Sequence, residues 1–265
     1  MANLRFTILG CGSSGGVPRI GNLWGDCDPT NPKNRRTRCS LLVERREAGG
    51  TTTVLIDTSP DMRAQLLAAN VSALDAVVYT HSHADHVHGI DDLRQLVFLN
   101  RLRLPVWADG PTQEALYSRF AYAFIQPEGS SYPPICTMNT IKDRITITGD
   151  GGAIDLTPFE VDHGDITALG LRIAGLAYVP DVSSLPDAAW AHLSNLDWWV
   201  VDALRRKPHP THAHLDLTLE WIARAAPAHA VLTNMHLDLD HATVEAETPP
   251  HVFAAYDGMV IEIEV

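Results

Sequence analysis

The segment YTHSHADHVHG, residues 79–89, places four histidines and one aspartate within eleven positions. It follows the apolar run LDAVVYT, whose β-branched residues predict a strand. Imidazoles that become buried need partners, because each ring brings two polar nitrogens into the interior. We therefore expect a sheet strand to end here and a ligand-binding cluster to begin.

The spacing within HxHxDH favours metal ions. His81 and His83 are separated by one residue, so they can face the same way in an extended segment. Asp85 and His86 follow after a short turn and can aim at a second point nearby. A single site would already be complete with three protein ligands and water, so the pattern suits two adjacent ions better. The alternative is a polar loop that is rich in histidine by accident.

Further candidate ligands follow later strand-like runs. His163 ends LTPFEVDH, Asp181 ends LAYVPD, and Asn234 and His236 follow HAVLT. Ligands gathered at strand ends are what α/β architectures favour. Each of these residues alone could be an ordinary loop or turn residue. Their occurrence together with HxHxDH, in this order, favours a shared metal site.

Mixed strands and helices predict one α/β domain over residues 1–265. The hydrophobic fraction of 45% is sufficient for a substantial core. Strands are expected at 4–9, 39–44, 53–57, 75–80, 153–162, 168–175, 176–181, 196–204 and 229–235, and helices at 60–70 and 215–227. The irregular segment 120–135 is a possible insertion, either over the active site or at a homodimer contact.

The sequence also predicts a cytoplasmic location without membrane contact. No basic region followed by a sustained apolar stretch opens the chain, and no apolar run is long enough for a membrane span. The four cysteines are scattered without a CxxC pair, so they are expected to be reduced thiols.

The motifs together resemble the metallo-β-lactamase superfamily, and within it the PhnP-type phosphodiesterases, which are related to tRNase Z. The glycine-rich opening ILGCGSSGGVPRIG, the segment YTHSHADHVHGIDDLR, and LAYVPDVSSLP, THAHLDLTLEWI and LTNMHLDLDH follow that pattern in order. The resemblance covers nearly the whole chain and implies a four-layer αββα sandwich. It also implies that His81, His83 and His163 hold one metal, that Asp85 and His86 hold the second, and that Asp181 bridges both.

The chain departs from the family pattern at two sites, the structural zinc site and the final metal ligand. The cysteine cluster that binds a structural zinc in that family is reduced here to Cys27, and its histidine corresponds to Leu237. We therefore expect no structural zinc. The final ligand histidine corresponds to Asn234, but His236 would point to the same side if the chain stayed extended. Because imidazole is a better ligand than a neutral amide, His236 is the predicted last ligand.

Such a site suits phosphodiester hydrolysis by two divalent ions, with zinc or manganese expected. The ions would make hydroxide available near neutral pH and neutralise phosphate oxygens, with Asp85 as both ligand and catalytic residue. The resemblance identifies His212, three residues before Leu215, as the proton donor to the leaving oxygen. Ser13 and Ser14 are candidate contacts to the substrate phosphate. Asp57 is expected to orient a ligand histidine by a hydrogen bond.

The expected substrate is a small cyclic phosphate, such as phosphoribosyl 1,2-cyclic phosphate, or a nucleotide-like diester. A tRNase Z-like ribonuclease is the alternative enzyme, but the formal net charge of −12 argues against a large nucleic-acid partner. A thioester or lactone hydrolase fits the glycine-rich opening less well. A third alternative is a nucleotide-binding module whose second metal site is degraded at Asn234.

Overall fold

The computed structural model describes residues 3–265, which form two compact units. Unit 1 combines residues up to Leu9 with Ser40–Asp155 and Val260–Val265, and unit 2 combines Gly10–Cys39 with Leu156–Met259. Neither unit is a continuous stretch of sequence. That residues 1–265 form one domain stays a prediction.

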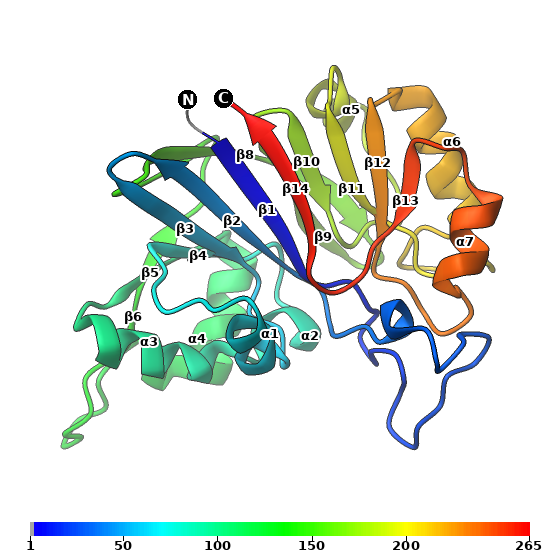
Figure 1. The fold of residues 1–265 in the computed structure, drawn as a ribbon. Coiled ribbons are helices and arrows are strands. Elements are labelled where there is room, and N and C mark those ends of the chain that lie inside the picture. The colour runs from blue at the N-terminus through cyan, green and yellow to red at the C-terminus, as the bar shows by residue number, and fades with distance from the viewer. Residues whose placement is uncertain (1–2) are drawn as a thin grey trace. The chain divides into compact units, whose positions relative to one another are not determined.

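The sheet of unit 1 has seven strands in the order β14-β1-β2-β3-β4-β5-β6 (Figure 1). β2 and β3 pair antiparallel, whereas β3 to β6 pair in parallel. The strands are β1 (Asn3–Gly10), β2 (Ser40–Glu47), β3 (Gly50–Ile56), β4 (Ala76–Val78), β5 (Leu104–Ala108), β6 (Cys136–Thr140) and β14 (Met259–Glu264).

Helices cover one face of this sheet and bury its core. They are α1 (Met62–Ala68), α2 (Ala84–Val87), α3 (Leu93–Asn100) and α4 (Gly110–Phe124). Strand residues such as Leu42 and Leu55 share one hydrophobic cluster with helix residues such as Met62, Leu93 and Leu116. Burial of each such side chain stabilises the fold by about 1.5–3 kcal/mol. This packing fixes the segment between β4 and α3, which carries HxHxDH.

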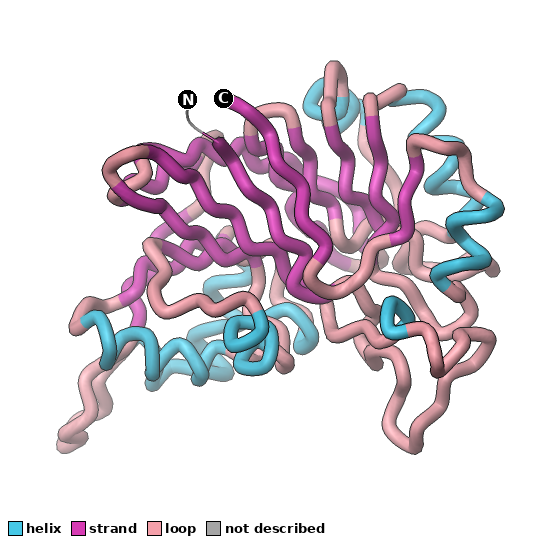
Figure 2. The backbone as a smooth tube through the Cα atoms, in the orientation of Figure 1, coloured by secondary structure: helices cyan, strands magenta, loops and turns pink. Residues whose placement is uncertain are grey.

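The second sheet has the order β13-β12-β11-β10-β9-β8-β7. Its strands are β7 (Ile145–Gly149), β8 (Gly152–His163), β9 (Ile166–Ile173), β10 (Leu176–Val179), β11 (Trp198–Asp202), β12 (His229–Thr233) and β13 (Val252–Ala254). Helices α5 (Asp187–Trp190), α6 (Leu215–Ala225) and α7 (His241–Glu247) alternate with the later strands (Figure 2). β10 to β13 pair in parallel, which requires such crossover connections.

Parallel pairing brings three polar residues of unit 2 to one edge of the sheet. Asp181 follows β10, Asp202 ends β11 and Asn234 follows β12. Because the carboxyl ends of adjacent parallel strands meet at the same edge, these side chains become neighbours.

The predicted strands correspond to β1–β4 and β8–β12, and the predicted helices to α1 and α6. Residues 120–124 belong to α4, and residues 125–135 form the loop that leads to β6. None of the helices in residues 3–265 combines the length and the apolar character that a membrane crossing needs.

Candidate metal centre

The histidine segment of unit 1 leaves β4 and turns directly into α2. His81 is 1% exposed and His86 is completely buried, whereas His83 is exposed at the residue before α2. The ring centroids of His81 and His83 lie 4.7 Å apart, and those of His81 and His86 lie 4.2 Å apart. The segment therefore gathers its imidazoles, as the HxHxDH spacing predicts.

Asp57 fixes the orientation of two of these rings. His86 Nδ1 lies 2.7 Å from Asp57 Oδ2, and His81 Nδ1 lies 3.0 Å from Thr80 Oγ1. The Thr80 hydroxyl in turn donates to Asp57 Oδ2 at 2.8 Å. The backbone N–H of Thr80 donates to Asp57 Oδ1, also at 2.8 Å. With Nδ1 of both rings engaged, Nε2 is the nitrogen that can coordinate a metal. The predicted hydrogen bond from a histidine to Asp57 is thus confirmed.

The backbone at Asp57 is unusual for a buried aspartate. Its φ of 62° lies in the left-handed region, which Asp and Asn enter more readily than most residues. Burial raises the pKa of its carboxyl, while the contact with His86 and the donors of Thr80 oppose that rise. Strained backbone of this kind persists where the surrounding structure holds it, and it is frequent at functional sites.

In unit 2, His163 is held in the same manner at the end of β8. Its Nδ1–H donates to the carbonyl oxygen of Thr211 at 2.6 Å, which leaves Nε2 as the ligand atom. That Nε2 lies 3.5 Å from Asp181 Oδ2. Both side chains are buried, with exposed fractions of 1% and 2%.

His212 stands beside His163, with ring centroids 4.6 Å apart. Its Nδ1 lies 2.8 Å from Oδ2 of Asp202, a carboxylate that is completely buried. Burial raises the pKa of Asp202 to about 7, although the hydrogen bond and charge of His212 oppose that rise. Leu215 begins α6, as predicted, so His212 lies on the loop before that helix. Because Asp202 occupies Nδ1 of His212, Nε2 is the nitrogen that remains to contact a substrate.

Two groups of side chains offer the ligand types that a metal ion needs. The first group is His81, His83, His163 and Asp181, and the second is Asp85, His86 and Asp181. His81, His83, Asp85 and His86 belong to unit 1, and His163 and Asp181 belong to unit 2. Imidazole nitrogens and carboxylate oxygens suit zinc and manganese. This His/Asp cluster can bind divalent metal.

His236, the predicted last ligand, lies outside both groups. Its Nδ1 is 3.2 Å from Asp238 Oδ1. Asn234 lies beside the cluster instead: its Nδ2 donates to Asp181 Oδ1 at 3.2 Å and stands 3.2 Å from His212 Nδ1. The prediction assumed an extended chain, whereas Asn234 has a φ of 59°, in the left-handed region. The assignment of His236 as the last ligand stays a prediction.

The two candidate phosphate-binding serines differ in environment. Ser13 is 2% exposed, and among the described residues its hydroxyl has no hydrogen-bond partner. Its N–H donates to the carbonyl of Met235 at 3.3 Å, which places it beside the strand end that carries Asn234. Ser14 is exposed. A buried hydroxyl without a partner can bind a ligand oxygen, so Ser13 is the better candidate of the two.

Protein contacts hold the segment around Cys27, where the family pattern has the cysteines of its structural zinc site. The N–H of Asp26 donates to the carbonyl of Leu237 at 2.8 Å. The buried guanidinium of Arg36 lies 3.9 Å from Cys27 Sγ and donates to the carbonyl of Leu239 at 2.7 Å. The two segments are therefore connected through the side chains present. The expectation of no structural zinc stays a prediction for metal analysis.

The sequence model of the β-lactamase superfamily domain matches residues 52–235, and the chain belongs to that superfamily. The predicted α/β sandwich fold is thereby confirmed. A crystal structure of a diphosphatase from the PhnP family is 35% identical, with a TM-score of 0.87, covering 99% of this chain and 98% of that one. The predicted membership of the PhnP family is confirmed by this likeness.

Two further relatives extend the comparison. An octanoyltransferase of Porphyromonas gingivalis is 32% identical over 265 residues, which cover 97% of this chain and 51% of that protein. This chain thus spans only about half the length of that relative. Human tRNase Z, short form, is 14% identical, with a TM-score of 0.66, over 98% of this chain and 100% of that one. At this identity the likeness shows the fold alone.

Proposed function

We propose that the chain hydrolyses a small phosphodiester, either a cyclic phosphate or a nucleotide-like diester. The observation that carries the proposal is the pairing of His212 with the buried Asp202, beside the proposed metal ligands His163 and Asp181. A metal site alone would suit many hydrolases. A histidine held by a carboxylate, next to that site, adds the proton donor that an alkoxide leaving group needs.

We propose His81, His83, His163 and Asp181 as ligands of one ion, and Asp85, His86 and Asp181 as ligands of a second. Zinc or manganese suits these ligands. When bound, such ions neutralise phosphate oxygens and make a water molecule acidic enough to attack near neutral pH. The oriented Nδ1 atoms of three histidines support this set, because they leave Nε2 available in each ring.

The protein groups would act on the substrate as follows. His212, protonated on both ring nitrogens, donates the Nε2 proton to the leaving oxygen, and Asp202 stabilises the protonated ring through Nδ1–H. Asn234 holds Asp181 through its amide nitrogen. The hydroxyl of Ser13 donates to a phosphate oxygen.

A second candidate is hydrolysis of the diphosphate bond in a nucleotide-like substrate. It is favoured by the likeness to the PhnP-family diphosphatase, which is 35% identical to this chain. The attacked centre is again a phosphorus with two ester-type oxygens, but the leaving group is a phosphate. A phosphate leaves with less need of a proton, so this reaction depends less on His212.

Two alternatives have less support. A tRNase Z-like ribonuclease would need basic surface to bind tRNA, whereas this chain has a formal net charge of −12. Acyl transfer is suggested only by the name of a relative of which the chain spans about half. A cytoplasmic location and a homodimer remain part of the proposal.

Hydrolysis of two substrates by metal-reconstituted protein tests the proposal. Bis(p-nitrophenyl) phosphate reports phosphodiester cleavage, and ADP-ribose with product analysis reports diphosphate cleavage. Turnover of the first substrate, with a loss of at least tenfold in His212→Ala at unchanged metal content, is expected. Turnover of ADP-ribose alone, with little effect of His212→Ala, would favour the diphosphatase. Turnover of neither would refute both.

A further inference from the structure

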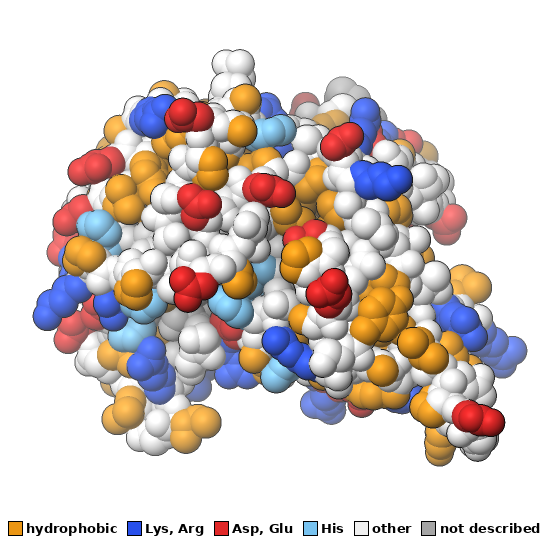
Figure 3. Space-filling view, turned by 180° about the vertical axis from the view of Figure 1, so that it is seen from behind, with side chains coloured by type: hydrophobic (Ala, Val, Ile, Leu, Met, Phe, Trp, Pro, Cys, Tyr) orange, Lys and Arg blue, Asp and Glu red, His pale blue; other side chains and the backbone are white. Residues whose placement is uncertain are grey.

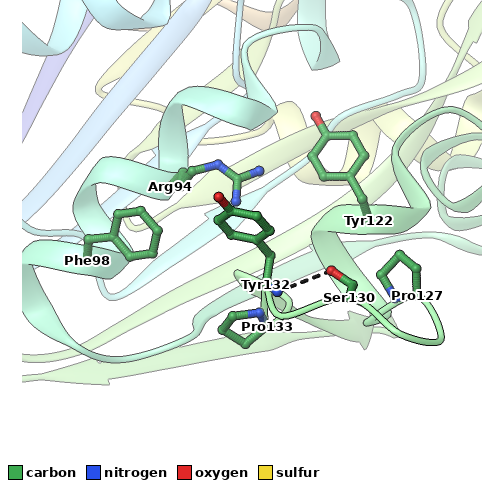
Figure 4. Close-up of a pocket in the computed structure, with 7 residues that line it drawn as sticks. All are labelled: Arg94, Phe98, Tyr122, Pro127, Ser130, Tyr132 and Pro133. Carbon is green, nitrogen blue, oxygen red and sulfur yellow. Dashed lines mark hydrogen bonds between the residues drawn. The ribbon is translucent and has the colours of Figure 1, made fainter.

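A cavity of about 430 Å³ lies in unit 1 among α3, α4 and the loop 125–135. Arg94, Phe98, Tyr122, Pro127, Ser130, Tyr132 and Pro133 line it, and we call it the Tyr132 pocket. Figure 4 shows the rings of Phe98, Tyr122 and Tyr132 around the guanidinium of Arg94. Cavities of this size are typical of small-molecule sites, which combine apolar walls with a few polar groups.

The lining exposes aromatic surface to solvent. Tyr132 is 69% exposed, Phe98 is 53% exposed and Tyr122 is 40% exposed. Figure 3 shows hydrophobic side chains beside the protruding segment at the lower right. Exposed apolar patches of this kind frequently mark binding sites.

The polar wall of the pocket is held in place by one carboxylate. Asp91 accepts a hydrogen bond from Arg94 Nη2 at 2.8 Å and another from the Tyr122 hydroxyl. The Arg94 guanidinium also lies 5.8 Å from the centroid of the Tyr122 ring. The loop is fixed as well, since Ser130 Oγ accepts from the N–H of Tyr132 at 3.1 Å. A partly prearranged wall loses less entropy when a ligand binds.

Helix α4 connects this pocket to the histidine segment within unit 1. Arg119 donates to the carbonyl of Ser82, which lies between two proposed ligands, and the Phe120 ring packs edge-on against His88 at 5.5 Å. Tyr122 follows on the same helix. Arg94 lies eight residues after His86, on α3, the helix that follows α2. The pocket and the histidine segment are therefore parts of one packed substructure.

We infer that the Tyr132 pocket binds the planar aromatic ring of a nucleotide-like substrate, that is, its nucleobase. The inference rests on the proposed function, because the phosphate of that substrate would be the group hydrolysed at the metal centre. Tyrosine and phenylalanine rings stack on bases of any type, and a guanidinium adds cation–π attraction and donors for ring oxygens and nitrogens. An aliphatic ligand would gain neither the stacking nor the donor contacts.

Calorimetric binding of AMP and of ribose 5-phosphate to metal-loaded protein tests the inference, because the two ligands share a phosphate and differ by the base. Wild type is expected to bind AMP at least tenfold more tightly. Tyr132→Ala should abolish most of this preference and leave ribose 5-phosphate affinity unchanged, while Tyr132→Phe should retain it. Tyr117→Ala, which removes an exposed ring on α4 outside the pocket, is the matched control.

Equal affinity for the two ligands in wild type, or an unchanged preference in Tyr132→Ala, would overturn the inference. A wild-type dimer that becomes monomeric in Tyr132→Ala, without any preference for AMP, would assign the surface to contact between two copies and would also overturn it. Hydrolysis of bis(p-nitrophenyl) phosphate by wild type is measured separately. Its absence would refute the proposed phosphodiesterase, whereas the binding data would still decide the role of the pocket.

Discussion

His212 Nδ1 lies 2.8 Å from Oδ2 of the completely buried Asp202, and the two side chains form a pair beside His163. Because the carboxylate contacts Nδ1, Nε2 is the nitrogen of His212 that faces away from Asp202. Catalysis by this histidine should therefore depend on a residue that has no contact with solvent.

Asp202→Asn should lower turnover of a phosphodiester by at least tenfold without loss of metal. The amide is nearly isosteric, but it cannot stabilise a protonated imidazole as a carboxylate does. Steady-state rates and metal content measured on the same preparation check this expectation. His209→Ala removes a neighbouring ring, 5.3 Å from that of His212, and should keep the rate within twofold. A fully active Asp202→Asn would contradict the assigned role of the pair.

Asp57→Asn should weaken metal binding by about 10- to 100-fold, the effect of removing a carboxylate that orients ligand histidines. Asparagine tolerates the φ of 62° at this position, so the variant should fold. Competition with a chromophoric chelator measures the affinity, and circular dichroism measures folding. Unchanged affinity in a folded variant would show that the hydrogen bonds to His86 and Thr80 do not support the ligands.

Most of the candidate centre could be predicted from sequence, because its residues stand at strand ends and strand ends can be read from composition. HxHxDH follows β4, His163 ends β8 and Asp181 follows β10, as expected. Asp202 was missed, although it also ends a strand. In WWVVDAL it resembles an ordinary strand terminus, and only the pairing with His212 reveals its role.

The distinction between Asn234 and His236 could not be read from sequence. It depends on the backbone conformation of one residue, and the left-handed φ of Asn234 follows from the surrounding packing. Asparagine is tolerant of that conformation without requiring it. Helix α4 and the Tyr132 pocket were missed for a related reason. Their aromatic, proline and glycine residues fit no simple period, so the segment seemed irregular throughout.

Asn234→Ala and His236→Ala should differ in their effect on the metal centre. The first removes the donor to Asp181 and the neighbour of His212, so metal affinity and turnover should both fall, turnover by at least tenfold. The second removes a ring that faces Asp238 and should leave both quantities unchanged. Metal titration with parallel rate measurement makes the comparison. A loss of metal in His236→Ala alone would establish His236 as the last ligand.

Asp257 should make stability decrease as the pH rises. Burial raises its pKa to about 6 from an ordinary 3.8, although hydrogen bonds from Thr37 oppose the rise. Because the folded-state pKa is the higher one, the contribution is fully present below pH 3.8 and is lost as the pH rises through 6. At about 1.4 kcal/mol for each pKa unit, the loss amounts to about 3 kcal/mol.

Denaturant unfolding of wild type and Asp257→Asn at pH 4 and pH 8 measures this contribution. Wild type should lose about 2.4 kcal/mol relative to the variant between the two values, since asparagine does not ionise. Comparison with the variant cancels the titration of all other groups. A stability difference that is the same at both pH values would mean that Asp257 titrates normally.

The most direct test of the central claim is a metal titration of chelator-treated protein in which bound zinc or manganese and bis(p-nitrophenyl) phosphate hydrolysis are followed together. The account predicts that the metal-free chain is inactive and that activity appears as the His/Asp centre fills, approaching its maximum at about two ions per chain. Full activity without metal, or a metal-loaded chain that hydrolyses no phosphodiester, would contradict it.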